Sequence, residues 1–165
     1  LTLNLMDKFE AGEFDLVLVK REPLGPALGA KVWREPLVWA SAPAMVFDPA
    51  QPLPLIVSPQ PCVYRKRAMS ALDRTGRSWR VAYTSPSLAG TQAAVHAGLG
   101  VTILPKEMVP PGLQVLGENE GMPDLEDTEI ALCRRPGPPS RPVDRLAEHI
   151  IRALETRDDP IGVPA

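Results

Sequence analysis

Residues 53–62 read Leu53-Pro54-Leu55-Ile56-Val57-Ser58-Pro59-Gln60-Pro61-Cys62, and they indicate the class of fold. The first half, residues 53–57, is an unbroken apolar run that follows Pro52, which is typical of a buried strand. Pro61 then favours the start of a helix, because proline fits the first helical turn, and apolar residues at helical spacing continue up to Gly76. A buried strand that leads directly into a helix is typical of an α/β protein.

The alternation of strands and helices continues along the rest of the chain. Apolar residues at helical spacing predict helices over residues 4–11, 88–97 and 142–155. Short apolar or alternating runs predict strands over residues 36–40, 79–84, 101–104, 113–116 and 129–133. The run Phe14–Val19 is almost continuously apolar and predicts a strand buried on both faces. We therefore expect an α/β fold built on a mostly parallel sheet.

Two proline-containing breaks, at residues 42–52 and 106–112, divide this pattern. The strands around them are short, which suits two small sheets better than one large one. We expect the breaks to be crossings between two lobes, one formed by residues 1–40 with 107–165 and the other by residues 41–106. A Pro/Gly-rich connection is expected at residues 22–29, and the last ten residues are expected to fray.

The composition excludes several classes of protein. Of the 165 residues, 44% are hydrophobic and 23% are charged, which is typical of a globular domain. The net charge of −2 lacks the basic excess of a nucleic-acid-binding domain. No apolar run approaches the roughly 18 residues of a membrane span, and no signal peptide opens the sequence. The two cysteines, Cys62 and Cys133, have no metal-ligand spacing, so we expect reduced thiols in a cytoplasm and no metal or cofactor.

Two features that suggest enzyme chemistry have plainer explanations. Gly98-Leu99-Gly100-Val101 resembles part of a dinucleotide-binding fingerprint, but here a helix precedes the glycines and a strand follows them, the reverse of that motif. We interpret it as a helix C-cap and a tight entry into a strand. His96 and His149 are expected on solvated helix faces, because the sequence has neither a serine-nucleophile elbow nor a cluster of metal ligands.

The charged stretches are also expected to be solvated. Tyr64-Arg65-Lys66-Arg67 is the one basic cluster, and its cations would fan across more than one face of a helix. A phosphate-contact patch usually needs more charge, so we favour a solvated helix face over nucleic-acid binding. The acidic residues between 118 and 129 are more typical of a solvated loop than of a cation site.

Polar residues follow two of the predicted strands where each leads into a helix. Ser58, Gln60 and Cys62 follow residues 53–57, while Thr84 and Ser85 close the strand at 79–84. Ligands of open α/β sheets bind outside the carboxyl ends of the strands, and a helix N-terminus offers unpaired N–H groups to an anion. Helix capping alone explains each junction equally well, but two junctions in one lobe favour a ligand site.

Several segments, in the expected order, resemble the effector domain of LysR-type transcriptional regulators. The first is Phe9-Glu10-Ala11-Gly12-Glu13-Phe14-Asp15-Leu16-Val17-Leu18-Val19. Next come Glu35-Pro36-Leu37-Val38, then Pro54-Leu55-Ile56-Val57 with Cys62-Val63-Tyr64-Arg65. The most specific is Ser87-Leu88 with Ala94-Val95-His96-Ala97-Gly98-Leu99-Gly100-Val101-Thr102-Ile103-Leu104-Pro105. The resemblance extends to about Leu154.

The resemblance implies a two-lobed, periplasmic-binding-protein-like (type 2) α/β domain that binds a small-molecule effector between its lobes. The helix N-terminus that follows Ser58 favours an anionic effector. Members of this family carry an N-terminal winged helix-turn-helix, so DNA binding is expected only through such a part, which this sequence does not contain. Association into a homodimer or homotetramer is expected as well. The first strand and helix of the first lobe are expected to be missing, with Leu1-Thr2-Leu3 as the tail of its second strand.

The junctions and the resemblance together predict the effector site. We expect its lining to comprise Thr2, Ser58, Gln60, Cys62, Thr84 and Ser85. Backbone dipoles, rather than an arginine, are expected to bind the anion, and no catalytic residue is predicted.

Two alternatives remain, a solute-binding protein and an enzyme on a related two-lobed architecture. Export signals would favour the solute binder, and a nucleophile–base or carboxylate pair would favour the enzyme. We find neither in the sequence. A helix-turn-helix in the upstream sequence would decide for a regulator.

Overall fold

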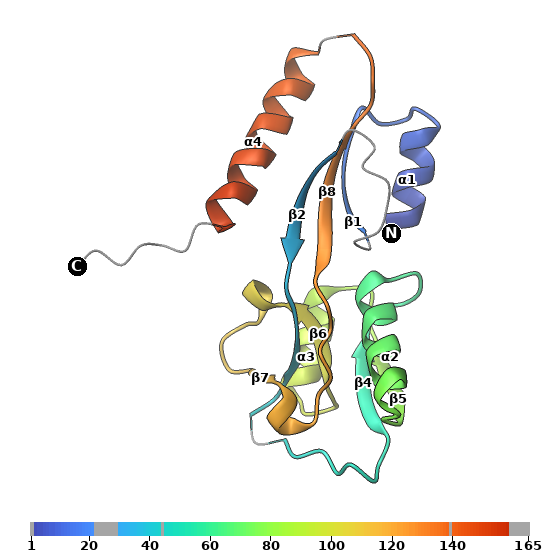
Figure 1. Ribbon diagram of the computed structural model, residues 1–165, viewed down its shortest axis with the longest axis vertical. Coiled ribbons are helices and arrows are strands. Elements are labelled where there is room, and N and C mark those ends of the chain that lie inside the picture. Colours follow the sequence, from blue (N-terminus) through green and yellow to red (C-terminus); the bar gives the residue numbers. More distant parts are fainter. Residues whose placement is uncertain (1, 22–29, 44, 139, 159–165) are drawn as a thin grey trace, which may run out of the picture. The chain divides into compact units, whose positions relative to one another are not determined.

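The computed structural model describes residues 2–21, 30–43, 45–138 and 140–158 (Figure 1). The chain divides into a central unit, Arg34–Thr128, and an outer unit formed by Thr2–Trp33 together with Glu129–Ala165. Two covalent crossings, at Trp33–Arg34 and at Thr128–Glu129, join the units. These crossings differ from the expected lobe boundaries near residues 40 and 107. The expected connection at 22–29 and most of the expected frayed end lie outside the described residues.

The sheet of the outer unit has three strands in the part of the chain that the structure describes. They are β1 (Leu16–Arg21), β2 (Ala30–Glu35) and β8 (Thr128–Arg134), in the order β1-β8-β2. β1 and β8 are antiparallel, with Val17 opposite Cys133. Because β2 and β8 each pass through a crossing, they connect the outer unit to the central one along the chain.

A helix packs on each face of this sheet. α1 (Thr2–Glu10) and α4 (Arg141–Asp158) lie on opposite sides of the strands in Figure 1. Side chains alternate between the two faces of a strand, so neighbouring residues of β1 and β8 pack on different helices. One cluster joins α1 to the sheet through Leu5, Met6, Phe9, Val17, Val19, Ala131 and Cys133. The other joins α4 to it through Leu16, Trp33, Leu132, Ala147, Ile150, Ile151 and Leu154.

Among the described residues of the central unit, five strands form its sheet structure. β4 (Leu53–Val57) and β5 (Trp79–Thr84) are parallel neighbours. β3 (Leu37–Ser41) lies between β6 (Thr102–Pro105) and β7 (Gln114–Leu116) and is antiparallel to both.

Backbone hydrogen bonds at Val101 join these two groups of strands. The Val101 N–H donates to the Pro54 carbonyl at 2.9 Å, and the Ile56 N–H donates to the Val101 carbonyl at 2.8 Å. Thr102, which is buried, adds a side-chain bond from its hydroxyl to the Ile56 carbonyl at 2.8 Å. β4 is therefore hydrogen-bonded along both edges.

β4 is also covered on both faces. α2 (Val63–Thr75) packs on the face that holds Leu55 and Val57, through Ala68, Ala71 and Leu72. α3 (Leu88–His96) packs on the opposite side, where Ile56 meets Ala94 and Val95. Two short 3₁₀ segments, Lys106–Met108 and Glu118–Glu120, lie in the later connections.

The expected α/β class and the predicted helices and strands are confirmed, but the mostly parallel sheet is wrong. The β4–β5 pairing is parallel, whereas the β1–β8, β3–β6 and β3–β7 pairings are antiparallel. Apolar runs indicate that a strand is covered on both faces, and helices can cover strands of either direction. Within the described residues, no helix is long and apolar enough to cross a membrane.

Two further expectations about strands need correction. The sequence does not predict β2, because its residues AKVWRE form neither an apolar run nor a strict alternation, and they follow a Pro/Gly-rich connection. β1 is not buried on both faces: Val17 and Val19 are 5% exposed, but Leu18 is 42% exposed. Leu18 points to the face opposite Val17 and Val19, where the α4 cluster includes Leu16 but not Leu18.

The glycine pair before β6 turns the chain from helix to strand, as interpreted from the sequence. Gly98, at φ +74°, donates its N–H to the Val95 carbonyl, and the Leu99 N–H bonds back to Ala94. Gly100, at φ +158°, lies directly against β4. A Cβ at this position would stand 2.3 Å from the Pro54 carbonyl oxygen, which is the acceptor of the Val101 N–H.

We expect Gly100→Ala to destabilise the protein by about 1–3 kcal/mol, because the added methyl must push β4 away from Val101 or distort the backbone. Thermal or urea unfolding measures the loss. Gly137→Ala is the matched control, since among the described residues no atom beyond its chain neighbours lies within 4 Å of its added Cβ. Equal stability of the two variants would contradict the close approach of Gly100 to Pro54.

Candidate functional site

The two polar junctions predicted from the sequence lie next to each other in the central unit. Val57 and Thr84 are paired at the carboxyl ends of the parallel strands β4 and β5. The Ser85 N–H also donates to the Val57 carbonyl at 3.0 Å. The β4–α2 connection, which begins at Ser58, and the β5–α3 connection, which begins at Ser85, therefore leave the sheet from neighbouring positions.

The first junction leads into α2 through Cys62. Cys62 is the N-cap residue, with extended backbone angles, and its side chain accepts no capping hydrogen bond from the described helix. The exposed Gln60 and the half-buried Ser58 precede it. Arg65 donates from Nη1 to the Ser58 carbonyl at 3.2 Å, so a cation lies beside this turn. The first N–H groups of α2 thus face the junction without a capping side chain, next to a positive charge.

The second junction is more self-contained. Ser87 is the N-cap of α3, and its hydroxyl accepts the Gly90 N–H at 3.0 Å. Ser85 is 4% exposed; its hydroxyl donates to the Ser87 carbonyl at 3.1 Å and accepts the Ser87 N–H at 3.3 Å. Thr84 is exposed. The hydroxyl of Ser85 therefore organises the turn, whereas that of Thr84 is on the surface.

Thr2 differs from its expected position. It was expected near the end of a strand, but it is the first residue of α1. A helix here follows from Leu5, Met6 and Phe9, whose spacing forms the apolar side that packs on β1. Thr2 belongs to the outer unit, and the other five predicted residues belong to the central unit. A role for Thr2 in ligand binding stays a prediction.

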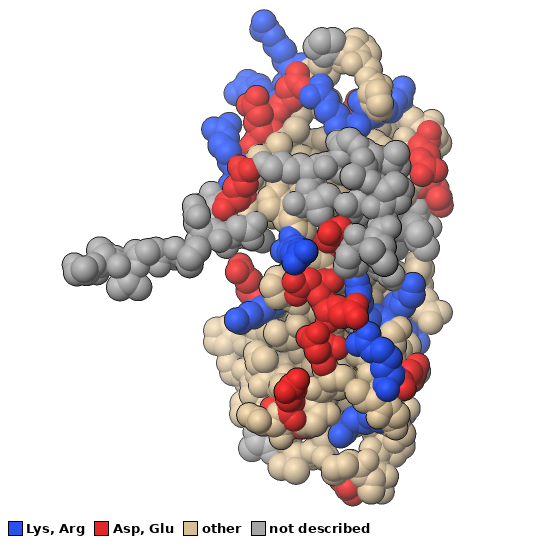
Figure 2. All heavy atoms as spheres, viewed as in Figure 1, with Lys and Arg blue, Asp and Glu red and all other residues tan. Residues whose placement is uncertain are grey.

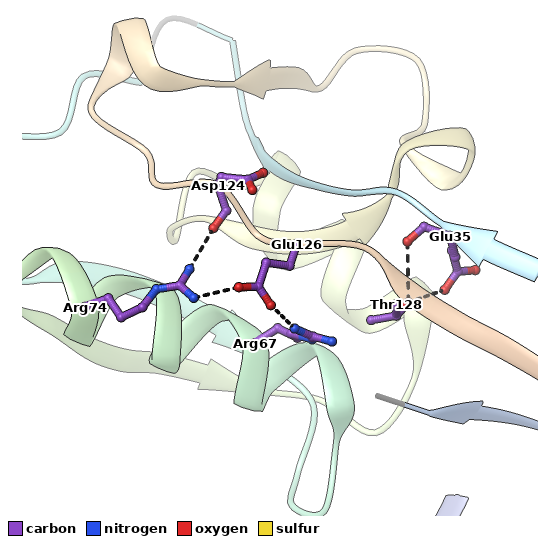
Figure 3. Close-up of polar contacts among 6 residues, drawn as sticks. All are labelled: Glu35, Arg67, Arg74, Asp124, Glu126 and Thr128. Carbon is purple, nitrogen blue, oxygen red and sulfur yellow. Dashed lines mark hydrogen bonds and ion pairs between the residues drawn. The ribbon is translucent and has the colours of Figure 1, made fainter. Parts of the chain in front are cut away.

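The basic cluster on α2 is not simply a solvated face, which corrects the expectation for Arg65 and Arg67. Arg67 has a side chain only 13% exposed, and its Nη1 lies 2.5 Å from Glu126 Oε2. Further along the helix, Arg74 Nη1 lies 2.8 Å from Glu126 Oε1, and Nη2 lies 3.5 Å from the Asp124 carbonyl. Figure 3 shows Glu126 between the two arginines, which both reach it from α2. Lys66 is exposed, as expected.

A second polar cluster has no counterpart among the expectations from sequence. The Tyr64 hydroxyl donates to Glu35 Oε2. The Thr128 hydroxyl lies 3.3 Å from the same oxygen and 3.5 Å from the Glu35 carbonyl, as Figure 3 shows. Burial, and then the hydrogen bond and negative charge of Glu35, raise the pKa of the Tyr64 phenol far above its usual value. Tyr64 thus stays protonated and acts as a hydrogen-bond donor.

The remaining charged residues are distributed without a strong patch on the face that Figure 2 displays. Basic and acidic side chains are interspersed there. His96 and His149 are exposed on α3 and α4, as expected. Among the described residues, no group of three His, Cys, Asp or Glu could hold a metal ion.

The family of this chain follows from its similarity to known protein families. Residues 2–155 match the LysR substrate binding domain family. The chain is a LysR substrate-binding domain. The resemblance found in the sequence is thereby confirmed over nearly the whole chain, and the two compact units belong to the two-lobed, periplasmic-binding-protein-like fold class of LysR regulatory domains.

Two relatives of this LysR domain are named as transcriptional regulators. The HTH-type transcriptional regulator PecT of Dickeya dadantii (strain 3937) is 34% identical over 135 residues, which are 81% of this chain and 42% of PecT. The HTH-type transcriptional regulator DgdR of Burkholderia cepacia is 33% identical over 153 residues, 93% of this chain and 52% of DgdR. The chain therefore spans about half the length of these relatives.

Solved structures confirm the fold of the LysR domain. The regulatory domain of CcmR from Synechocystis PCC6803, in complex with 2-PG, has a TM-score of 0.68 at 13% identity and covers 99% of this chain and 82% of its own. Full-length HypT from Salmonella typhimurium has a TM-score of 0.70 at 16% identity, over 92% of this chain and 55% of its own. The reduced form of OxyR has a TM-score of 0.65 at 24% identity, over 96% and 80%.

Glu126 provides a test of the contact between α2 and the segment before β8. The hydrogen bond from Arg74 and the charges of Arg74 and Arg67 lower its pKa. The stabilisation is therefore present above the usual carboxyl pKa and is lost as pH falls through the lowered pKa. We expect Glu126→Gln to lower the unfolding temperature slightly at neutral pH, and the difference to disappear in acid and to shrink with salt. Glu118→Gln, in the exposed 3₁₀ segment Glu118–Glu120, is the control and should lower the unfolding temperature at neutral pH less than Glu126→Gln does.

Tyr64 provides a test of the second cluster. A phenol whose pKa is raised on folding stabilises the protein below the usual tyrosine pKa of about 10, and this stabilisation is lost as pH rises above it. In a Tyr83→Phe variant, which leaves Tyr64 as the single tyrosine, we expect tyrosinate absorbance to appear only together with alkaline unfolding. Ionisation near pH 10 with an unchanged circular dichroism spectrum would contradict the buried hydrogen bond to Glu35.

Proposed function

We propose that this chain is the effector-sensing domain of a LysR-type transcriptional regulator, and that it binds a small anionic metabolite at the N-terminal end of α2. The observation that carries the proposal is the pair of adjacent junctions at the carboxyl ends of β4 and β5. There the uncapped N–H groups of α2 and the side chain of Arg65 combine with the polar side chains of Gln60 and Thr84. A helix N-terminus beside a cation favours a carboxylate or a similar anion.

The ligands of structurally similar domains support an anion. The matched CcmR domain is in complex with 2-PG, a HypT regulatory domain has a bound bromide ion, and the QuiR effector-binding domain is in complex with shikimate. The contribution of Arg65 departs from the expectation that backbone dipoles act without an arginine. Cys62 would contribute to anion binding mainly as the N-cap residue of α2. Ser58 would contribute through its backbone carbonyl, which positions Arg65.

The regulator's other activities are proposed from its relatives. PecT and DgdR are HTH-type regulators about twice the length of the matched segment, so DNA binding is assigned to a helix-turn-helix outside this chain. The net charge of −2 agrees with a domain that does not itself bind DNA. We also propose a cytoplasmic location, a homodimeric or homotetrameric assembly and no enzymatic activity. A solute-binding protein or an enzyme is disfavoured, because the relatives at 33–34% identity are regulators.

The site is tested by titrating the complete protein with shikimate, 2-PG and bromide, followed by other small carboxylates, in a calorimeter. For an anion that binds, we expect Gln60→Ala and Thr84→Val each to weaken binding several-fold, because each removes a hydrogen bond of about 1 kcal/mol. Gln51→Ala is the matched control: Gln51 is also exposed, but it lies just before the amino end of β4. Wild-type affinity in both site variants would exclude this site.

A further inference from the structure

Glu35 receives hydrogen bonds from two hydroxyls that come from different parts of the chain. Glu35 is the last residue of β2 and lies one residue beyond the first crossing, Trp33–Arg34. Thr128 is the first residue of β8 and immediately precedes the second crossing, Thr128–Glu129. Tyr64 is the second residue of α2. All three residues belong to the central unit. Because Tyr64 and Thr128 both bond to Glu35, the Glu35 carboxylate links the residues at both crossings to the first turn of α2.

The same face of α2 holds a second contact with the segment that leads to β8. Tyr64, Arg67 and Arg74 are spaced by three and seven residues, which places them along one side of a helix. Arg67 and Arg74 pair with Glu126, two residues before Thr128. α2 therefore contacts the first crossing through Tyr64 and the segment before the second crossing through Arg67 and Arg74.

The hydrogen bonds at Glu35 are stronger than the ion pairs at Glu126. Thr128 is fully buried and Tyr64 is partly buried, whereas Glu126 is exposed with a side chain 51% accessible. A hydrogen bond to a carboxylate strengthens as water is excluded, while exposed ion pairs contribute little. Movement of the first turn of α2 would therefore alter the bonds at both crossings.

We propose that Glu35 is a positioning residue that couples the first turn of α2 to the two strands connecting the units. The inference rests on the proposed function, because that turn is where the anion is proposed to bind. An anion that accepts hydrogen bonds from the N–H groups of the turn shifts Tyr64. The shift of Tyr64 moves Glu35, and with it both crossings. By thermodynamic reciprocity, a change at the crossings alters anion affinity to the same extent.

Hydrogen–deuterium exchange of the complete protein, measured without ligand, tests the coupling. Tyr64→Phe removes the donor from α2, and we expect the amides of Arg34, Glu35 and Leu37 and of residues 127–130 to exchange on the order of tenfold faster. Thr128→Val removes the other donor, and we expect amides at residues 62–66 to exchange faster by a similar factor. Thr128→Ser retains a hydroxyl and should restore wild-type exchange. Tyr83→Phe, which removes a phenol from the exposed side of β5, should change neither region.

The outcomes separate the coupling from the proposed function. Changes confined to the element that carries each substitution would overturn the coupling, even if an anion binds at α2. Distant changes in exchange, combined with no binding of shikimate, 2-PG or bromide, would support the coupling and count against the anion site. If shikimate binds, it should protect residues 62–66 and change exchange at both crossings in the wild type. In Tyr64→Phe it should protect residues 62–66 alone; a retained response at the crossings would overturn the role of Tyr64.

Discussion

β4 is the element on which the central unit depends. Its backbone is hydrogen-bonded to β5 on one edge and to Val101 on the other, and its side chains are covered by α2 on one face and α3 on the other. Leu55 and Ile56 are completely buried as a result. Because a strand with both edges paired and both faces covered has almost no freedom, its carboxyl end is a rigid place from which to position a ligand site.

The orientation of α2 follows from two kinds of contact with different strengths. Ala68, Ala71 and Leu72 are buried against the sheet, and complete burial of a leucine side chain contributes about 1.5–3 kcal/mol. Exposed ion pairs, such as those of Glu126, contribute far less, because water and salt screen them. The apolar face therefore fixes the helix on the sheet. The polar face determines which segments the helix contacts, and these are the segments next to the crossings.

The candidate site shows which of its features local sequence patterns can predict. A strand that leads directly into a helix, and is followed by polar residues, can be recognised from neighbouring residues alone, and this pattern points to Ser58, Gln60, Cys62, Thr84 and Ser85. The same pattern does not reveal that Ser85 uses its hydroxyl inside the turn, because the choice between capping and ligand binding depends on the conformation of three residues. The family resemblance predicted Thr2 at the end of a strand, and this prediction was wrong. Leu5, Met6 and Phe9 follow at helical spacing, and the helix that they form already begins at Thr2.

The α/β class and the location of nearly every helix and strand follow from the amino-acid sequence alone, because they depend on periodicity and turn residues within a short window. The family follows from the resemblance of several segments that occur in the expected order along the chain. Strand direction, the partners of the α2 arginines and the cluster around Glu35 depend instead on tertiary packing. Tyr64 and Glu35 are 29 residues apart, and Thr128 and Glu35 are 93 apart. No periodicity relates residues at such separations; the packing of the strands and of α2 in the central unit brings them together.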